Sequence, residues 1–527
     1  MDRKYVEYSV EMAEKLIAID SPTGYTAKAA AWVEQEFKAL GFPTRITNKG
    51  GVLVDLGGED SSDAILLMTH LDTIGAMVAE IKANGRLRMS PLGGLHAPGL
   101  EGENVRVYTR SGKVYTGTIQ LPNPSVHVAD EYDKAERSWK TLECVLDETV
   151  LSKEDVRKLG IENGDIVDVV SLKGKYLGSG FFSQHSKIKV RLLSRNANDV
   201  FDDDFFCRRL QYSYQYRKTI MSGYDNYRLV FGESDQLPGL TIDRYNDILV
   251  SQISCFGMEK IRNRIYQLLL DILKEDGIEI KAIYQRNDVS SRSLEGLTLD
   301  SYYPFVSDNY NKDNHEVIID ENNVKFIVDY VDGQKTGFFL DQKFNRLLVR
   351  DFVKGKKVLD CFTHTGSFAL NCALAGASRV VALDISENAI NQAKRNAEIN
   401  GLADKIDFVV GDTFDYLDKV NKKQFDLIIL DPPAFTKSKN TTINAYNGYK
   451  NINARAMKLL PRGGFLVSCS CSHFMSQTDF EKMLAEAAQL ADVSLKQISF
   501  SQQGKDHPIL LNVNETNYLK FYILQVI

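Results

Sequence analysis

Four short apolar segments in the last third of the chain each end on an aspartate, and this pattern limits the possible folds more than any other feature. The aspartates are Asp360, Asp384, Asp412 and Asp431. Helical patterns lie between the segments, so that residues 346–527 alternate helix and strand five or six times. Such alternation is typical of a parallel sheet with helices on both faces. Because the carboxyl ends of parallel strands meet at one edge, we expect the four side chains to line one crevice.

The loop after Asp360 indicates what kind of ligand this crevice holds. It contains one glycine, Gly366, whereas loops that bind dinucleotide phosphates carry G-x-G-x-x-G, so a nicotinamide dinucleotide is disfavoured. The helix that begins there offers free N–H groups to a ligand carboxylate. Asp384 has the spacing of a side chain that accepts hydrogen bonds from a ribose, and Asp412 is a candidate for an adenine amino group. Each aspartate alone is equally well explained as a helix N-cap.

The fourth and fifth strand ends carry groups suited to chemistry on a substrate. Asp431 is followed by Pro432-Pro433-Ala434-Phe435, a stiff extended turn that holds a carboxylate and a ring at the sheet's edge. Cys469 and Cys471 stand at the end of the fifth strand. We expect Cys469 to be a small buried side chain and Cys471 to face the crevice.

Five motifs in order resemble the class I rRNA large-subunit cytosine-C5 methyltransferase family. They are GESDQLPGLTIDRY at 232–245, DGQKTGFFLDQ at 332–342, the loop from Asp360, DPPAF at 431–435 and SCS at 470–472. The resemblance covers about residues 164–527 and implies a PUA domain, a central α+β domain and a Rossmann-like catalytic domain. It also implies an enzyme, an S-adenosylmethionine-dependent RNA (cytosine-5-)-methyltransferase acting on 23S rRNA, with no metal required.

The resemblance further implies roles for individual residues. The nucleophile would be Cys471, and Asp431 would hydrogen-bond the cytosine edge in a pocket shaped by Pro433 and Phe435. The implied cofactor-binding residues are Asp341, Gln342, Asp360, Phe362, Thr363, Gly366, Asp384 and Asp412. A thiolate suits this reaction, because cytosine C5 is a poor nucleophile until a group adds at C6. Two alternatives stay open: an amino-group methyltransferase that uses Asp-Pro-Pro without a thiol, and a non-catalytic module that only binds S-adenosylmethionine or RNA.

The first 170 residues resemble a different family, the M42 metallo-aminopeptidases. The resemblance includes Thr69-His70-Leu71-Asp72, which follows two runs, 52–56 and 64–68, expected to be buried parallel strands. His70 would bind a metal in that family, but a dinuclear site needs four to six ligands, and the later ligands have no counterpart here. We therefore expect His70 and Asp72 to be vestigial and an aminopeptidase, the other enzymatic alternative, to be inactive.

The two resemblances meet at residues 164–169, which indicates a gene fusion that truncates both partners. The expected fold is a multidomain α/β chain with five parts: a partial α/β peptidase fragment (1–78), a peptidase-type β-barrel (79–168), a PUA remnant (165–195), a central α+β domain (196–318) and the Rossmann-like methyltransferase domain (319–527). Strands that lose their partners by truncation should be exposed, and exposed strands favour aggregation.

Composition bears on the cellular setting. The seven cysteines form no CxxC pair, which argues against a disulfide framework and a zinc cluster and favours a cytoplasmic protein. No apolar run approaches the roughly 18 residues of a membrane helix, so no membrane partner is expected. The expected partner is large-subunit rRNA, and a homodimer stays an open option.

Overall fold

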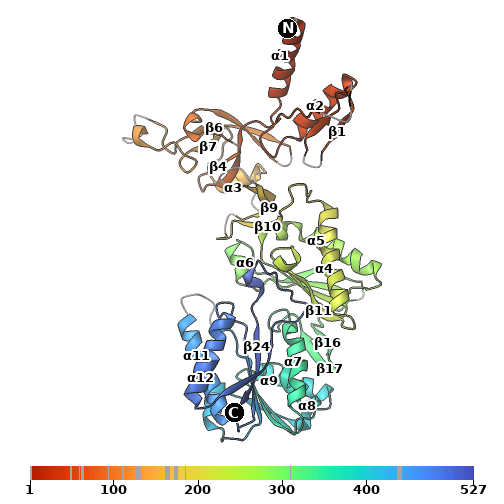
Figure 1. The fold of residues 1–527 in the computed structure, drawn as a ribbon, viewed down its shortest axis with the longest axis vertical. Coiled ribbons are helices and arrows are strands. Elements are labelled where there is room, and N and C mark those ends of the chain that lie inside the picture. Colours follow the sequence, from red (N-terminus) through yellow and green to blue (C-terminus); the bar gives the residue numbers. More distant parts are fainter. Residues whose placement is uncertain are drawn as a thin grey trace. The chain divides into compact units, whose positions relative to one another are not determined.

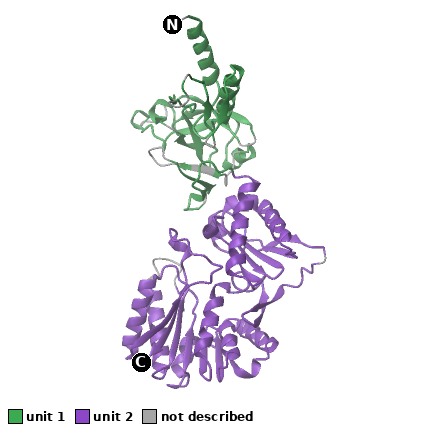
Figure 2. Ribbon diagram, turned by 45° about the vertical axis from the view of Figure 1, so that its right-hand side comes forward, with its two compact units in different colours: residues 1–200 green, residues 201–527 purple. Residues whose placement is uncertain are grey.

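The computed structural model describes residues 3–47, 50–58, 60, 65–92, 94–109, 112–125, 132–160, 166–170, 176–183, 186–308, 310–435 and 442–527. The chain forms two compact units, residues 1–200 and 201–527 (Figure 2). The five ranges expected from the sequence divide the chain more finely, and their boundaries stay predictions. Residues 164 and 165, at the expected fusion point, lie outside the described residues.

The first unit begins with two helices and a strand pair. These elements are α1 (Arg3–Ile17), α2 (Ala27–Ala39), β1 (Thr44–Ile46) and β2 (Val52–Val54). The expectation of buried parallel strands is wrong here, because β2 pairs with β1 in antiparallel fashion and residues 65–68 form no strand. The side chains of Ile65 and Met68 are 88% and 85% exposed. Among the described residues, no strand pairs with residues 65–68.

A five-stranded antiparallel sheet forms the body of the first unit, in the order β3-β4-β7-β6-β5. Its strands are β3 (Gly75–Ile81), β4 (Leu87–Leu92), β5 (Asn104–Tyr108), β6 (Val114–Gln120) and β7 (Glu143–Leu146), followed by α3 (Lys153–Lys158). Leu87, Ile119 and Leu142 form its core. A three-stranded sheet follows, made of β8 (Ile166–Val170), β9 (Tyr176–Phe182) and β10 (Val190–Ser194). Its assignment to a PUA remnant stays a prediction.

The second unit starts with a mixed sheet and two long helices (Figure 1). Its elements are α4 (Asp203–Ile220), β11 (Asn226–Phe231), β12 (Leu240–Tyr245), β13 (Ile248–Ile253), α5 (Phe256–Glu275), β14 (Ala282–Gln285), α6 (Ser291–Leu294) and β15 (Tyr302–Val306). The strands pair in chain order, and β13 and β14 are parallel. A hairpin of β16 (Glu316–Glu321) and β17 (Val324–Asp329) then leads into the last domain.

The last domain is a seven-stranded sheet in the order β20-β19-β18-β21-β22-β24-β23. The strands are β18 (Lys357–Cys361), β19 (Arg379–Asp384), β20 (Ile406–Val410), β21 (Leu427–Leu430), β22 (Phe465–Ser470), β23 (Leu495–Ser501) and β24 (Lys520–Val526). The first five in the sheet are parallel, whereas β24 runs antiparallel to β22 and β23. This topology confirms the Rossmann-like prediction for the five aspartate- and cysteine-bearing strands.

Helices cover both faces of this sheet, as Figure 1 shows. They are α7 (Lys343–Val349), α8 (Ser367–Leu374), α9 (Glu387–Ile399), α10 (Thr413–Lys419), α11 (Thr442–Leu459) and α12 (Gln477–Ala491). Alternate strand residues point to opposite faces, so Leu427 and Ile429 join one core cluster while Ile428 and Leu430 join the other. In the described part of the chain, no helix is long and apolar enough to cross a membrane.

Candidate active site

The strand ends predicted to converge lie along one edge of the sheet. Asp360 is the second-last residue of β18, Asp384 is the last residue of β19, and Asp431 directly follows β21. The pairing of β18 with β19 and β21 sets Asp360 opposite Ala382 and Ile429. Cys471 follows β22, which is the next strand beyond β21. The structure therefore brings these predicted residues to one edge, and their roles stay predictions.

Asp360 lies at the bottom of this edge and is fully buried. One carboxylate oxygen accepts hydrogen bonds from Thr363 Oγ1 at 2.5 Å and from the Ala369 amide at 2.9 Å. The other oxygen has no partner in the structure. Burial raises the pKa of Asp360 to about 7, and the nearby carboxylates of Asp431 and Asp384 add to the effect. A buried oxygen without a partner is costly, so it is a strong candidate for a ligand contact.

The loop from Phe362 to Gly366 has an unusual backbone. Phe362 and His364 have φ angles of 62° and 52°, which are rare for residues with a side chain. Gly366 has φ 80°, and a Cβ placed there would lie 3.0 Å from the Cβ of Ala393. The loop is tied to β19, because the Thr363 amide donates to Leu383 O at 3.0 Å. These restraints aim the N-terminus of α8 at the sheet's edge.

Asp384 and Asp412 occupy similar positions in the sequence pattern but have different surroundings. Both oxygens of Asp384 accept backbone amides, those of His364 and Ser386, each at 2.9 Å. Asp412 is exposed and caps α10 by accepting the amides of Phe414 and Asp415 on one oxygen. The N-cap interpretation is thus correct for Asp412, and its contact with an adenine stays a prediction.

Asp341 and Gln342 reach the same edge from the segment before α7. Asp341 accepts hydrogen bonds from Lys335 Nζ at 2.8 Å and Tyr518 OH at 2.7 Å. Burial acts to raise the pKa of Asp341, but Lys335, His507 and the Tyr518 hydroxyl together outweigh it and hold the pKa well below its usual range. Gln342 Nε2 donates to Asp431 Oδ2 at 3.1 Å. Burial raises the pKa of Asp431 to about 6, with a further contribution from Asp341.

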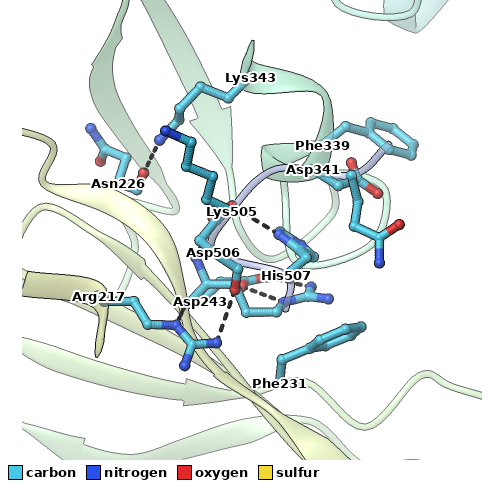
Figure 3. Close-up of polar contacts among 12 residues, drawn as sticks. Arg217, Asn226, Phe231, Asp243, Phe339, Asp341, Lys343, Lys505, Asp506 and His507 are labelled. Atoms are coloured by element: carbon cyan, nitrogen blue, oxygen red, sulfur yellow. Dashed lines mark hydrogen bonds and ion pairs between the residues drawn. The ribbon is translucent and has the colours of Figure 1, made fainter. Parts of the chain in front are cut away.

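Residues 504–507 connect Asp341 to the domain that contains α4 and β11. The Gly504 amide donates to Asp341 O at 2.7 Å. Asp506 accepts the Arg228 amide at 2.9 Å, and its own backbone oxygen accepts Arg217 at 2.9 Å. Figure 3 shows Asp506 and His507 between Arg217 on one side and Asp341 on the other. This buried cluster fixes the Asp341 segment relative to its neighbours.

Cys469 of β22 and Cys471, which follows it, differ in burial in the way the sequence predicted. Cys469 is fully buried, whereas Cys471 is partly exposed. Burial raises the pKa of the Cys471 thiol and Asp431 adds to the rise, while the Lys335 and Lys520 ammonium groups act in the opposite direction.

The residues that follow Asp431 bound the same edge. Pro433 is exposed, and Phe435 is half-buried with its ring 4.6 Å from that of Tyr449. Residues 436–441, which continue from Phe435, lie outside the described part of the chain.

Two lysines near Cys471 were missed by sequence reasoning. Lys335 lies inside the DGQKTG motif, where its position alone gave it no role. Lys520 belongs to no motif and lies between Leu519 and the apolar run Phe521-Tyr522-Ile523-Leu524. A charged residue at the start of a strand expected to be buried is the signal that could have identified it.

His70 and Asp72, which the sequence predicts to be a vestigial metal motif, are 84% and 38% exposed. His70 Nδ1 lies 3.2 Å from Asp72 Oδ1, and Thr23 donates to Asp72 at 2.7 Å. Among the described residues, no group of three or more His, Cys, Asp or Glu side chains could hold a metal ion.

Comparison with known proteins assigns different parts of the chain to different families. Residues 301–523 match the model of the S-adenosylmethionine-dependent methyltransferases, and residues 50–183 match that of the M42 glutamyl aminopeptidases. A Streptococcus mutans protein assigned as a SAM-dependent methyltransferase shares the fold, with a TM-score of 0.59 and 22% identity over 69% of this chain and 92% of that one.

Sequence relatives cover the same share of the chain. The ribosomal RNA large subunit methyltransferase I of Shewanella denitrificans is 41% identical over 373 residues, which is 69% of this chain and 90% of that protein. The enzyme of the same name from Pseudoalteromonas atlantica is 40% identical over 374 residues, 69% of this chain and 91% of that protein. The chain therefore belongs to the ribosomal RNA large subunit methyltransferase I family of S-adenosylmethionine-dependent methyltransferases.

Proposed function

We propose that this enzyme methylates C5 of a cytosine in large-subunit rRNA and that Cys471 is its nucleophile. The observation that carries the proposal is the contrast at the end of β22, where Cys471 is partly exposed beside Asp431 and Cys469 is buried. The relatives' name supplies the class of RNA. An amino-group methyltransferase would not need a thiol at this place.

The residues at the strand ends fit S-adenosylmethionine. The unpaired oxygen of Asp360 and the N-terminus of α8 behind Gly366 suit its ammonium and carboxylate groups. Asp384 has lone pairs left for the ribose, and Asp412 is proposed for the adenine. Further contacts are proposed from residues of the two adjoining loops, Asp341, Gln342, Phe362 and Thr363. When bound, S-adenosylmethionine supplies an electrophilic methyl group.

The remaining steps are carried by side chains of this chain acting on the base. The Cys471 thiolate adds to C6, which breaks the C5–C6 double bond and makes C5 nucleophilic. Asp431, with its pKa raised to about 6, hydrogen-bonds the N3/N4 edge and stabilises the charge that develops on the ring. After C5 takes up the methyl group, loss of the C5 proton to a base restores the double bond and expels the thiolate. Pro433 and Phe435 bound the pocket for the unstacked base.

RNA that contains 5-fluorocytosine tests the proposal, because fluorine cannot leave C5 as a proton does. The enzyme should become covalently linked to this RNA only when S-adenosylmethionine is present, as a mobility shift in a denaturing gel. Cys471→Ser should abolish both the adduct and methylation, since a hydroxyl is far less ionised than a thiol at neutral pH.

Cys469→Ser is the matched control and should leave both largely intact, because that side chain packs inside the sheet. If Cys469→Ser were inactive and Cys471→Ser active, the nucleophile would be the wrong cysteine of the pair. If neither substitution mattered, the amino-group alternative with Asp431-Pro432-Pro433 would replace C5 methylation.

A further inference from the structure

Two buried amide side chains connect α7 to Asp431. Asn345, in the first turn of α7, and Gln342, just before that helix, are three residues apart and so lie on the same side of it. Asn345 Nδ2 donates to Gln342 Oε1 at 2.7 Å, and Gln342 Nε2 donates to Asp431 Oδ2 at 3.1 Å. Only 1% of Asn345 and 3% of Gln342 are exposed. The three groups therefore form a continuous chain of hydrogen bonds that ends at the sheet's edge.

A backbone carbonyl fixes the direction of this hydrogen-bond chain. Asn345 Nδ2 also donates to Gln502 O, at 3.1 Å. A carbonyl oxygen can only accept, so the Asn345 atom that faces it must be nitrogen. The same nitrogen faces the Gln342 amide, which then presents its oxygen to Asn345 and its nitrogen to Asp431. Asp431 Oδ2 is therefore held as an acceptor.

Asn345 contributes to this arrangement as a donor only. Its Oδ1 is buried and has no hydrogen-bond partner among the described residues. A buried oxygen without a partner costs stability, yet turning the amide over would bring that oxygen against Gln502 O. The side chain thus leaves one polar atom unpaired while it holds Gln342 in one orientation.

The fixed direction determines where a proton sits on the Asp431 carboxyl group. Oδ2 accepts the N–H group of Gln342, and a protonated oxygen is the poorer acceptor, so the proton of the acid form is favoured on Oδ1. Burial raises the pKa of Asp431 to about 6 and Asp341 adds to the rise, so the acid form is accessible near neutral pH. Lys335, Arg346 and the Gln342 hydrogen bond act in the opposite direction. The acid form presents one donor, Oδ1, beside one acceptor, Oδ2.

A fixed order of donor and acceptor distinguishes cytosine from uracil. Cytosine accepts at N3 and donates from its 4-amino group, whereas uracil donates from N3 and accepts at O4. A carboxyl group whose order is fixed pairs with one of these edges and meets the other with donor against donor and acceptor against acceptor.

We propose that Asn345 is a positioning residue that, through Gln342, sets this order in Asp431 and so selects cytosine over uracil. Asp431 Oδ1 donates to N3 of the base, and Oδ2 accepts from the 4-amino group. The choice of cytosine as the selected base rests on the proposed function. The hydrogen-bond chain that fixes the order consists only of residues of this protein.

Base selectivity tests the proposal in the full chain. One RNA fragment contains the cytosine that the unaltered enzyme methylates, and a second has uracil at that position, which thiol addition at C6 can also activate. Mass spectrometry of 5-methylcytidine and 5-methyluridine gives the ratio of kcat/KM for the two, in which any loss of folded protein cancels. Asn345→Leu has a similar volume but cannot donate, so the Gln342 amide is free to turn over. It should lower the cytosine-to-uracil ratio about tenfold or more, since the polarity of a hydrogen bond is no longer enforced.

Two further variants make the result specific. Gln342→Met keeps a side chain of similar length but removes the donor to Asp431, and it should lower the ratio to a similar extent. Asn226→Leu is the matched control, because Asn226 is a buried asparagine of β11 whose side chain bonds Asp320 O at 3.2 Å and the Asn246 amide at 3.1 Å. This control should reduce stability without changing the ratio.

Several outcomes would overturn the proposal. An unchanged ratio in a folded Asn345→Leu protein would do so, as would an equal fall in Asn226→Leu. If Asn345→Leu does not fold, Gln342→Met decides, because an enzyme of that kind that still rejects uracil as strongly leaves the hydrogen-bond chain no role in selectivity. An unaltered enzyme that forms no 5-methylcytidine rejects the proposed function and this inference together. One that forms it, while the Asn345 and Gln342 variants keep its selectivity, rejects this inference alone.

Discussion

At the scale of one residue, Asp384 has a structural role in the loop before α8 and a proposed role in binding the ligand. Its carboxylate holds the amides of His364 and Ser386, and so it fixes the loop that leads to α8. Asp384→Ala should weaken S-adenosylmethionine binding by about 1.5–3 kcal/mol, the usual cost of losing hydrogen bonds to a charged group. Isothermal titration calorimetry measures this directly. Asp404→Ala is the control, because Asp404 is an exposed residue at the opposite end of β20, and unchanged binding in Asp384→Ala would remove Asp384 from the site.

Individual side chains were predictable where the sequence pattern fixes their position along a strand. Asp360, Asp384 and Asp431 fall at the sheet's edge because parallel strands align their carboxyl ends. The contacts of Lys520 were not predictable, because they depend on β24 lying antiparallel to β22, and no local pattern encodes a partner fifty residues away. The two-residue period of a strand places Cys469 and Cys471 on the same face, so the difference in their burial followed from the end of the strand between them.

At the scale of an element, the start of α8 is constrained by both backbone conformation and packing. Gly366 has φ 80° and a Cβ there would lie 3.0 Å from Ala393 Cβ and 3.2 Å from Leu370 Cδ1. Gly366→Ala should therefore lower the free energy of unfolding by about 1–3 kcal/mol and weaken S-adenosylmethionine binding, as measured by urea denaturation and calorimetry.

Gly376, just beyond the other end of α8, is a control that separates the effect of backbone strain from the effect of steric crowding by a Cβ. It also has a positive φ, 89°, but a Cβ there would meet only Lys354 Cγ, at 3.9 Å. Gly376→Ala should cost less stability than Gly366→Ala and should leave ligand affinity unchanged. Equal losses of affinity in the two variants would show that the effect comes from the fold rather than from the loop.

Elements were predictable from periodicity wherever their neighbours are present. The alternation of apolar runs and helices correctly gave the parallel strands β18 to β22. The segment 65–68 has the same apolar character but stays exposed. An apolar run becomes a strand only when another strand can pair with it, and that condition is not contained in the run itself.

At the scale of the whole molecule, the first unit contains segments that bury little apolar surface. Helix α1 has no buried residue, and residues 65–68 expose apolar side chains. A chain limited to residues 201–527 should therefore keep methyltransferase activity and aggregate less than the full chain, because it lacks these surfaces. Methylation assays and light scattering on the two proteins at equal concentration provide the comparison. A fragment that fails to fold, or that aggregates as readily, would place the liability in the second unit.

The place of β24 in the sheet has a consequence for how the enzyme is made. It lies between β22 and β23, although both precede it in the chain. While the ribosome is still synthesising residues 502–519, β22 and β23 have been synthesised but the strand that joins them has not. Domains generally fold as units during synthesis, so the strand leading to Cys471 must wait, with one edge open, until β24 arrives carrying Lys520. A nascent chain released before residue 520 would thus present β22 with an open edge, which is a template for pairing with another chain.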